Sequence, residues 1–115
     1  MIHVGIDPDV DKSGVAVWNG IDLHLFNMKF FELYKFLRTH SKAGTDIKVI
    51  IEAGWLNAKS NYHGYGYSAN ISARIGKNVG SNAQVGKLIV EMCEYLGLKY
   101  ELVRPTKSKV KNHKL

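Results

Sequence analysis

Residues 2–18, IHVGIDPDVDKSGVAVW, contain two apolar, β-forming runs with a polar turn between them. The first run ends on Asp7, and Pro8 then breaks the strand, because proline has no backbone N–H to donate to a sheet. Residues 8–14 are rich in the Pro, Asp, Ser and Gly that favour turns. Residues 15–18 resume a strand, so this stretch predicts an antiparallel pair of strands at the start of the fold.

A third strand and a helix are predicted next. Asn19 and Gly20 are a strong hairpin signal, and residues 21–26 alternate as the partner strand. The hydrophobic period then changes to that of a one-faced helix over residues 29–40, with Asn27 as its N-cap. The apolar positions of this helix are Phe30, Leu33, Tyr34 and Leu37.

The second half of the chain predicts two more strands, a loop and a helix. Residues 47–52, IKVIIE, favour a strand covered on both faces, which also ends on an acid, Glu52. Residues 53–76 are rich in Gly, Asn, Ser and Tyr and predict a long loop, a kind of segment that is often functional. Residues 81–84, SNAQ, fit a capping box, so a helix is expected to begin there or several residues earlier. A last strand is expected over residues 98–103.

The predicted order is β-β-β-α-β-α-β, which a single α/β domain over residues 1–115 accounts for. A helical crossover can carry the strand at residues 47–52 back to pair in parallel with the strand at residues 2–7. We therefore expect a mixed five-stranded sheet with residues 2–7 in its centre and helices packed on it.

Composition restricts the class of protein. The 115 residues are 45% hydrophobic and 23% charged, which excludes a wholly disordered chain. No run of eighteen apolar residues is present to span a membrane, and the first residues lack the pattern of a signal peptide. Cys93 is the only cysteine, so we interpret it as a core residue and expect a reducing, cytoplasmic environment.

Asp7 and Glu52 each close an apolar strand. If the two strands are parallel neighbours, they lie about 4.8 Å apart, and both carboxylates project at one edge of the sheet. Two negative charges this close are unfavourable unless a cation binds between them, and oxygen ligands suit Mg²⁺ or Mn²⁺ rather than zinc. The alternative is that each acid only marks where a strand meets solvent.

Two segments contain candidate contacts to DNA. Aromatic side chains stack on unpaired bases and cations bind phosphates, and the loop region holds both kinds, at Trp55, Lys59, Tyr65, Tyr67, Arg74 and Lys77. The net charge is +6, and five of the sixteen basic residues but no acid lie in residues 104–115. Arg104, Lys107 and Lys109 of this basic C-terminal segment could bind phosphates. The alternatives are a loop packed back on the domain and a solubilising tail.

GIDPDVDKSGVAV, residues 5–17, resembles the first strand and hairpin of the RuvC-like Holliday-junction resolvases, in the ribonuclease H-like superfamily. VIIEAGW, residues 49–55, is similar to the fourth strand of that family, and residues 78–107 resemble its following helix and fifth strand. The chain looks closest to the phage-type and bacterial short members, although Asp9 stands where the family usually has Gly. The resemblance implies a ribonuclease H-like fold.

The same resemblance implies a homodimeric enzyme that cuts branched DNA with two Mg²⁺ or Mn²⁺ ions. Asp7 and Glu52 match the metal-bridging acids and are therefore the implied catalytic and metal-binding residues. The family has further acids on a helix after the fifth strand, whereas no acid follows Glu101 here. We therefore expect the sequence to be a fragment, with weak or absent cleavage by this chain alone.

Three alternatives stay open. A non-catalytic DNA-binding module would have the same fold without cleaving DNA, and a structural α/β protein would have no nucleic-acid role. The helix around residues 85–96 could supply a dimer interface, or its apolar face could be used against the sheet.

Overall fold

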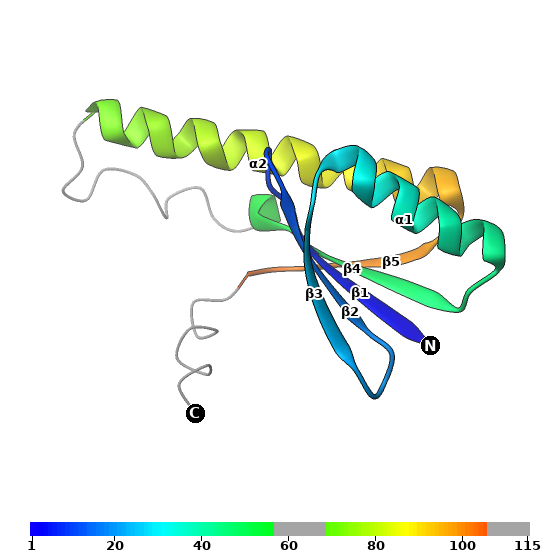
Figure 1. Cartoon of the computed structure of the whole chain (residues 1–115). Helices are drawn as coiled ribbons and strands as arrows, with labels where there is room; N and C mark the ends of the chain where they lie inside the picture. The colour runs from blue at the N-terminus through cyan, green and yellow to red at the C-terminus, as the bar shows by residue number, and fades with distance from the viewer. Residues whose placement is uncertain (57–68, 106–115) are drawn as a thin grey trace.

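A five-stranded sheet with the order β3-β2-β1-β4-β5 forms the centre of the structure (Figure 1). The structure is a computed structural model, which describes residues 1–56 and 69–105, with side chains for residues 1–56 and 80–105. The elements are β1 (Ile2–Asp7), β2 (Ser13–Trp18), β3 (Leu23–Met28), α1 (Phe30–Ala43), β4 (Ile47–Glu52), the 3₁₀ helix η1 (Gly54–Leu56), α2 (Ala69–Leu96) and β5 (Lys99–Val103).

The strand directions follow from the two helical crossovers. β1 pairs antiparallel with β2 and parallel with β4, and β4 pairs parallel with β5. The crossover through α1 carries the chain from the edge strand β3 past β2 and β1, so that β1 becomes the central strand. The predicted mixed five-stranded sheet with helices packed on it is confirmed by this order and these directions.

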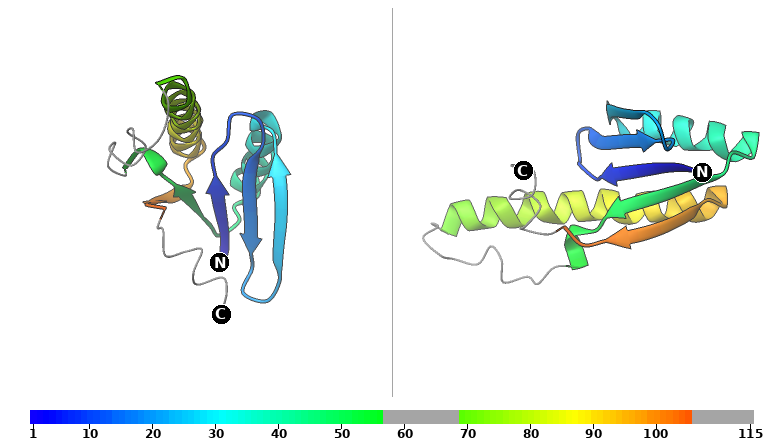
Figure 2. Two further views of the ribbon diagram at one scale, coloured as in Figure 1. Left: turned by 90° about the vertical axis from the view of Figure 1, so that its left-hand side faces the viewer. Right: turned by 90° about the horizontal axis from the view of Figure 1, so that it is seen from below.

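Both helices cover the same face of the sheet (Figures 1 and 2). The fully buried core side chains come from alternate positions of the strands and from one stripe on each helix; they include Val4, Ile6, Val15, Val49, Ile51, Leu33, Leu37, Ile89 and Cys93. The apolar face of α2 is therefore used against the sheet, as the second of the two alternatives for this helix expects. The interpretation of Cys93 as a core residue is confirmed.

The opposite face of the sheet is not covered by α1 or α2. Ile50 points to this face and is only half-buried, whereas its neighbours Val49 and Ile51 are fully buried. The prediction that residues 47–52 are covered on both faces is therefore wrong for the described part of the chain. Both helices lie on one side, because β3-α1-β4 and β4-α2-β5 are parallel crossovers of the same hand on a sheet that continues in one direction.

The β2–β3 hairpin has a longer turn than the dipeptide signal predicts. Trp18 pairs with Leu23, so the loop has four residues rather than two. The carboxamide oxygen of Asn19 accepts hydrogen bonds from the backbone N–H groups of Ile21 and Asp22, at 2.9 and 2.7 Å, and closes the loop. The third strand begins two residues later than predicted. Because side chains alternate with a period of two along a strand, each side chain still lies on the predicted face of the sheet.

The start of α1 differs slightly from the prediction. Lys29, not Asn27, is the N-cap residue, and the Glu32 carboxylate accepts a hydrogen bond from the Lys29 backbone N–H at 2.7 Å. Asn27 instead continues β3 in register with Gly14. Gly44 ends the helix in the left-handed conformation, with φ of 68°.

Helix α2 begins twelve residues before the predicted capping box at residue 81, so the prediction of a loop up to residue 76 is wrong from Ala69 onward. Residues 81–84 do not form a helix cap, because the helical backbone of α2 continues through them. Figure 1 shows the first turns of α2 extending beyond the sheet. In the described part of the chain, no helix combines the length and apolar composition needed to cross a bilayer.

Candidate active site

Asp7 and Glu52 lie side by side at the ends of two central strands. The parallel register of β1 and β4 pairs Ile6 with Ile51, and these two acids are the next residue on each strand. Both are on the face of the sheet that the helices leave open. The two carboxylates line the same two hollows, one on the open face and one toward α2.

The larger hollow is a groove of about 550 Å³ on the open face. Small residues form part of its floor, at Gly5, Gly14 and Ala16, and apolar side chains of β3, β4 and β5 border it. Neither Gly5 nor Gly14 has any atom closer than 3.7 Å to the place that a Cβ would occupy. A ligand can therefore approach the sheet backbone closely beside the two acids.

The smaller hollow, of about 170 Å³, lies between the two acids and α2. Pro8, Trp55, Asn82 and Pro105 are among the residues that line it. One side of this hollow is therefore aromatic and another is polar, and both are adjacent to the carboxylate pair.

The indole ring of Trp55 packs tightly beside the smaller hollow. Trp55, from η1, is half-buried and its indole ring lies against Gly86 of α2. A Cβ at residue 86 would lie 2.9 Å from Cη2 of Trp55 and 3.2 Å from Cγ of Pro8, closer than ordinary van der Waals contact. The absence of a side chain at Gly86 thus lets Trp55, Pro8 and α2 pack together directly after the strand ends that bear the acids.

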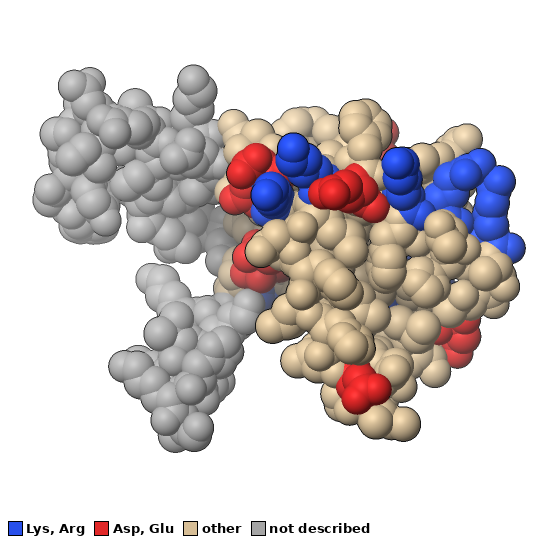
Figure 3. Space-filling model, viewed as in Figure 1, with Lys and Arg blue, Asp and Glu red and all other residues tan. Residues whose placement is uncertain are grey.

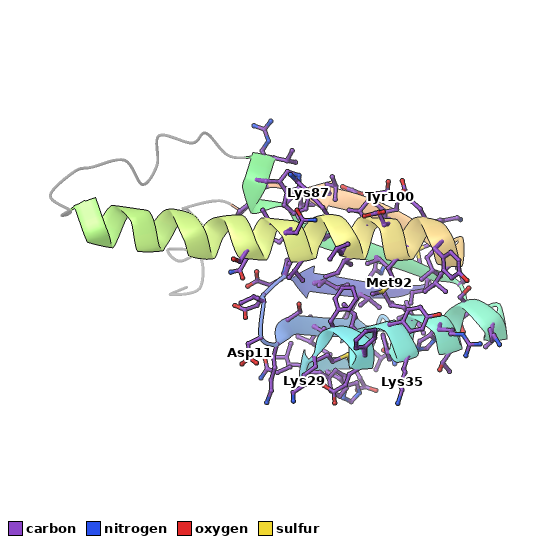
Figure 4. The ribbon with its side chains drawn as sticks, turned by 90° about the horizontal axis from the view of Figure 1, so that it is seen from above. Asp11, Lys29, Lys35, Lys87, Met92 and Tyr100 are labelled. Carbon is purple, nitrogen blue, oxygen red and sulfur yellow. The ribbon has the colours of Figure 1, made fainter. Side chains whose placement is uncertain are left out.

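The turn between β1 and β2 is held by hydrogen bonds that position the residues after Asp7. The Asn82 carboxamide oxygen accepts from the Val10 backbone N–H at 2.9 Å, which joins the turn to α2. Within the turn, the Asp9 carboxylate accepts from the Asp11 N–H at 2.8 Å, and the Ser13 hydroxyl accepts from the Asp9 N–H at 3.1 Å. Figure 4 shows Asp11 at the tip of this turn.

Sequence reasoning missed two residues of this site. Asn82 was assigned to a capping box, since Ser-Asn-Ala-Gln fits that pattern equally well. Gly86 was read as part of an ordinary helix, although an interior glycine is unfavourable in a helix and usually signals a close packing contact.

The donor set of the site suits a hard cation. Mg²⁺ is usually held by one or two carboxylates together with water and substrate phosphates, and Asp7 and Glu52 meet that requirement. Among the side chains that the structure describes, no group of three or more His, Cys, Asp or Glu is close enough to hold a metal ion. Two carboxylates are the protein ligands that such a Mg²⁺ site requires, with water and substrate phosphates as its other ligands.

The acid of β5 and the acid in the last turn of α2 are engaged elsewhere. Glu101 of β5 forms an ion pair with Lys48 at 2.7 Å, and the hydrogen bond and positive charge of Lys48 lower the pKa of the Glu101 carboxyl. Glu94 accepts a hydrogen bond from the Tyr100 hydroxyl at 2.8 Å, which raises the pKa of Tyr100. Neither acid joins the pair at the sheet edge.

The predicted DNA contacts fall into three groups. Arg104 is exposed and directly follows β5, whose parallel pairing with β4 places it at the same sheet edge as Glu52. Arg74 and Lys77 lie on the first turns of α2, not on a loop, and their side chains are not described. The predicted contacts outside the described residues are Lys59, Tyr65, Tyr67, Lys107 and Lys109.

Two solved structures of RuvC are similar to this chain. One is the Thermus thermophilus protein in complex with a Holliday junction substrate, with 13% sequence identity, a TM-score of 0.46, and coverage of 96% of this chain and 69% of that chain. The other is the Thermus thermophilus RuvC structure, with 14% identity, a TM-score of 0.46, and coverage of 95% and 67%. No protein-family model matches the chain, and no curated protein matches it.

Proposed function

We propose that this chain is a RuvC-like, metal-dependent endonuclease that hydrolyses phosphodiester bonds in Holliday junctions or other branched DNA. The observation that carries the proposal is the pairing of Asp7 and Glu52 at the ends of adjacent parallel strands, beside an open groove. Such an enzyme would act in DNA recombination and repair, and in the cytoplasm, where a lone cysteine stays reduced.

The two carboxylates would hold Mg²⁺ or Mn²⁺ and aim it at the scissile phosphate. A bound divalent ion supplies an activated water and neutralises charge on the leaving oxygen, chemistry that needs no covalent enzyme intermediate. Asp7 sits on the central strand and Glu52 on its neighbour, so the sheet hydrogen bonds fix their separation. Without the cation, the same two negative charges disfavour the approach of a phosphate.

Residues around the pair are proposed to hold the DNA. Arg104 would bind a phosphate beside the scissile bond, and Trp55 would offer an aromatic surface next to Glu52. The further contacts proposed from the sequence are Lys59, Tyr65, Tyr67, Arg74, Lys77, Lys107 and Lys109. Symmetric cutting of a junction needs two active sites, so we also propose a homodimer.

The test is a nicking assay on a four-way DNA junction with Mn²⁺. We expect Asp7→Asn and Glu52→Gln to abolish whatever metal-dependent nicking the unaltered chain shows. Asp22→Asn is the matched control, because Asp22 is an exposed acid in the β2–β3 loop, at the opposite edge of the sheet. Equal nicking by all three variants would overturn the assignment of the site.

A non-catalytic DNA-binding module with the same fold is the second candidate. The observation that favours it is that no three or more His, Cys, Asp or Glu side chains among the described residues lie close enough together to hold a metal ion. This candidate predicts tight junction binding in EDTA and no nicking with Mn²⁺. Robust symmetric nicking by the 115-residue chain would exclude it, and would also contradict the expectation of weak cleavage.

A further inference from the structure

The outward face of α1 carries a row of cations. Lys35, Arg38 and Lys42 occupy one face of the helix at spacings of three and four residues, and Phe31 continues the same face toward the helix start. All four side chains are exposed, and they lie opposite Leu33 and Leu37, which are fully buried in the core. The row is therefore directed to solvent along the length of the helix.

The three charges of this row, on Lys35, Arg38 and Lys42, are all positive. The one acid of α1, Glu32, is in the first turn and accepts the hydrogen bond from the Lys29 backbone N–H. The ion pairs found between described residues join the N-terminus to Asp46 and Lys48 to Glu101, so neither uses a cation of α1. Exposed helix faces that serve only for solvation usually mix both signs. Figure 3 shows Lys and Arg side chains gathered over α1.

The same face is hollowed. A surface hollow of about 610 Å³ is lined by Phe31, Tyr34, Lys35, Arg38 and Thr39. Phe31 is 74% exposed and provides an apolar contact within a basic surface. Figure 4 shows Lys29 and Lys35 extending from this side of the molecule, away from α2.

We propose that this outward face of α1, defined by Phe31, Lys35, Arg38 and Lys42, binds the phosphate backbone of a duplex arm of the branched DNA. The inference rests on the proposed function, because it adds a second DNA contact on the helical side of the sheet, opposite the groove beside the two acids. The three evenly spaced cations complement the repeating phosphates of a DNA strand, and the aromatic ring at the start of the row complements its apolar sugars.

The geometry suits a duplex arm. α1 starts directly after β3, whose end is at the sheet edge that bears Asp7 and Glu52, and it runs away from that edge. Eleven residues separate Phe31 from Lys42, which is about 16 Å of helix. One strand of B-DNA presents about five phosphates over that length. An arm that passes this sheet edge to the side of the helices can thus lie along α1.

The test is a salt titration of DNA binding in EDTA, by fluorescence anisotropy, with a four-way junction and with a plain duplex of one arm. The variant is Lys35→Gln/Arg38→Gln. The control is Lys87→Gln/Lys99→Gln, which removes the same charge from exposed positions on α2 and β5. We expect the α1 variant to lower the slope of log affinity against log salt by about 2 on both DNAs, since each lost phosphate contact contributes about 0.9.

An unchanged slope for the α1 variant, or an equal loss for both variants, would overturn the inference, as would failure of the unaltered chain to bind either DNA. The proposed function is judged separately by nicking. Loss of slope in the α1 variant without any Mn²⁺-dependent nicking would support the α1 surface and favour the non-catalytic DNA-binding module. Mn²⁺-dependent nicking with an unchanged slope would support the nuclease and overturn the proposed role of the α1 surface. Thermal melting of each variant shows that it remains folded.

Discussion

The indole ring of Trp55 lies against the backbone of Gly86, in the space that the side chain of any other residue at position 86 would need. This contact joins η1, which follows Glu52, to α2, and Pro8 packs against the same point. The two strand ends that bear the acids are therefore braced by one close contact between segments more than thirty residues apart.

Gly86→Ala is expected to destabilise the protein. Alanine is favoured over glycine in a helix by about 1 kcal/mol, but overpacking a filled site costs about 1–3 kcal/mol, and Trp55 and Pro8 are both rigid. We expect a net loss in the free energy of unfolding by urea, together with a shifted emission spectrum of Trp55. Gly80→Ala is the matched control, because nothing lies within 4 Å of a Cβ there, and it should be neutral or slightly stabilising. Equal stability of the two variants would contradict the packing argument.

Asn82→Ala is expected to loosen the turn after Asp7. The variant loses the acceptor for the Val10 N–H, a bond that spans 72 residues. A hydrogen bond of this kind contributes about 0.5–1.5 kcal/mol. Hydrogen exchange of the Val10 amide should accelerate by roughly tenfold, which corresponds to about 1.4 kcal/mol. Gln84→Ala, at an exposed position on the same helix, is the control and should leave the exchange rate of the Val10 amide unchanged. Faster exchange in this control as well would show that the effect comes from a change in α2 as a whole, not from the lost hydrogen bond.

Asp7→Asn is expected to remove the thermal stabilisation that Mn²⁺ provides. A ligand at 100 times its Kd stabilises the folded state by about 2.7 kcal/mol, which raises the melting temperature by several degrees in a small domain. Asp22→Asn should retain the full Mn²⁺ effect. A melting temperature of the unaltered chain that does not respond to Mn²⁺ would argue against a metal at this edge, whatever the nicking assay shows.

Cys93 is expected to react with thiol reagents only after unfolding. Burial, with a smaller contribution from the negative charge of Glu94, raises the pKa of Cys93 from 9.0 to about 11. At pH 8 the thiolate of the folded protein is then about 100-fold rarer than in the unfolded chain. Labelling with a disulfide reagent, with and without guanidinium, measures this difference. Fast labelling of the folded protein at pH 8 would contradict it.

The raised pKa of Cys93 also sets the sign of a pH effect on stability. The neutral thiol is favoured in the folded state, so its contribution is complete below pH 9 and is lost as the pH rises toward about 11. Cys93→Ala should flatten the loss of stability in that range, as measured by urea unfolding at several pH values.

The strands β1 and β4 could be predicted to the residue from the sequence. Pro8 ends the first because it cannot donate to a sheet, and the β-forming run of residues 47–52 closes on a charged side chain. The start of α2 could not be predicted, since a capping-box pattern acts as a cap only if the backbone before it is not helical. The four-residue loop after Trp18 was missed for a similar reason, because Asn19 bonds to residues beyond the expected two-residue turn.

The sequence by itself determined which residues could do chemistry and the strand ends on which they lie. Local periodicity and turn residues suffice for that, because they depend on near neighbours along the chain. The tertiary structure confirmed the expected adjacency of β1 and β4, which brings Asp7 and Glu52 together. Only the tertiary structure decided that one face of the sheet is uncovered by α1 and α2, and that Trp55, Gly86 and Asn82 support the site. These facts depend on contacts between residues far apart in the chain, and such contacts form only when the apolar stripes of both helices are buried against the sheet.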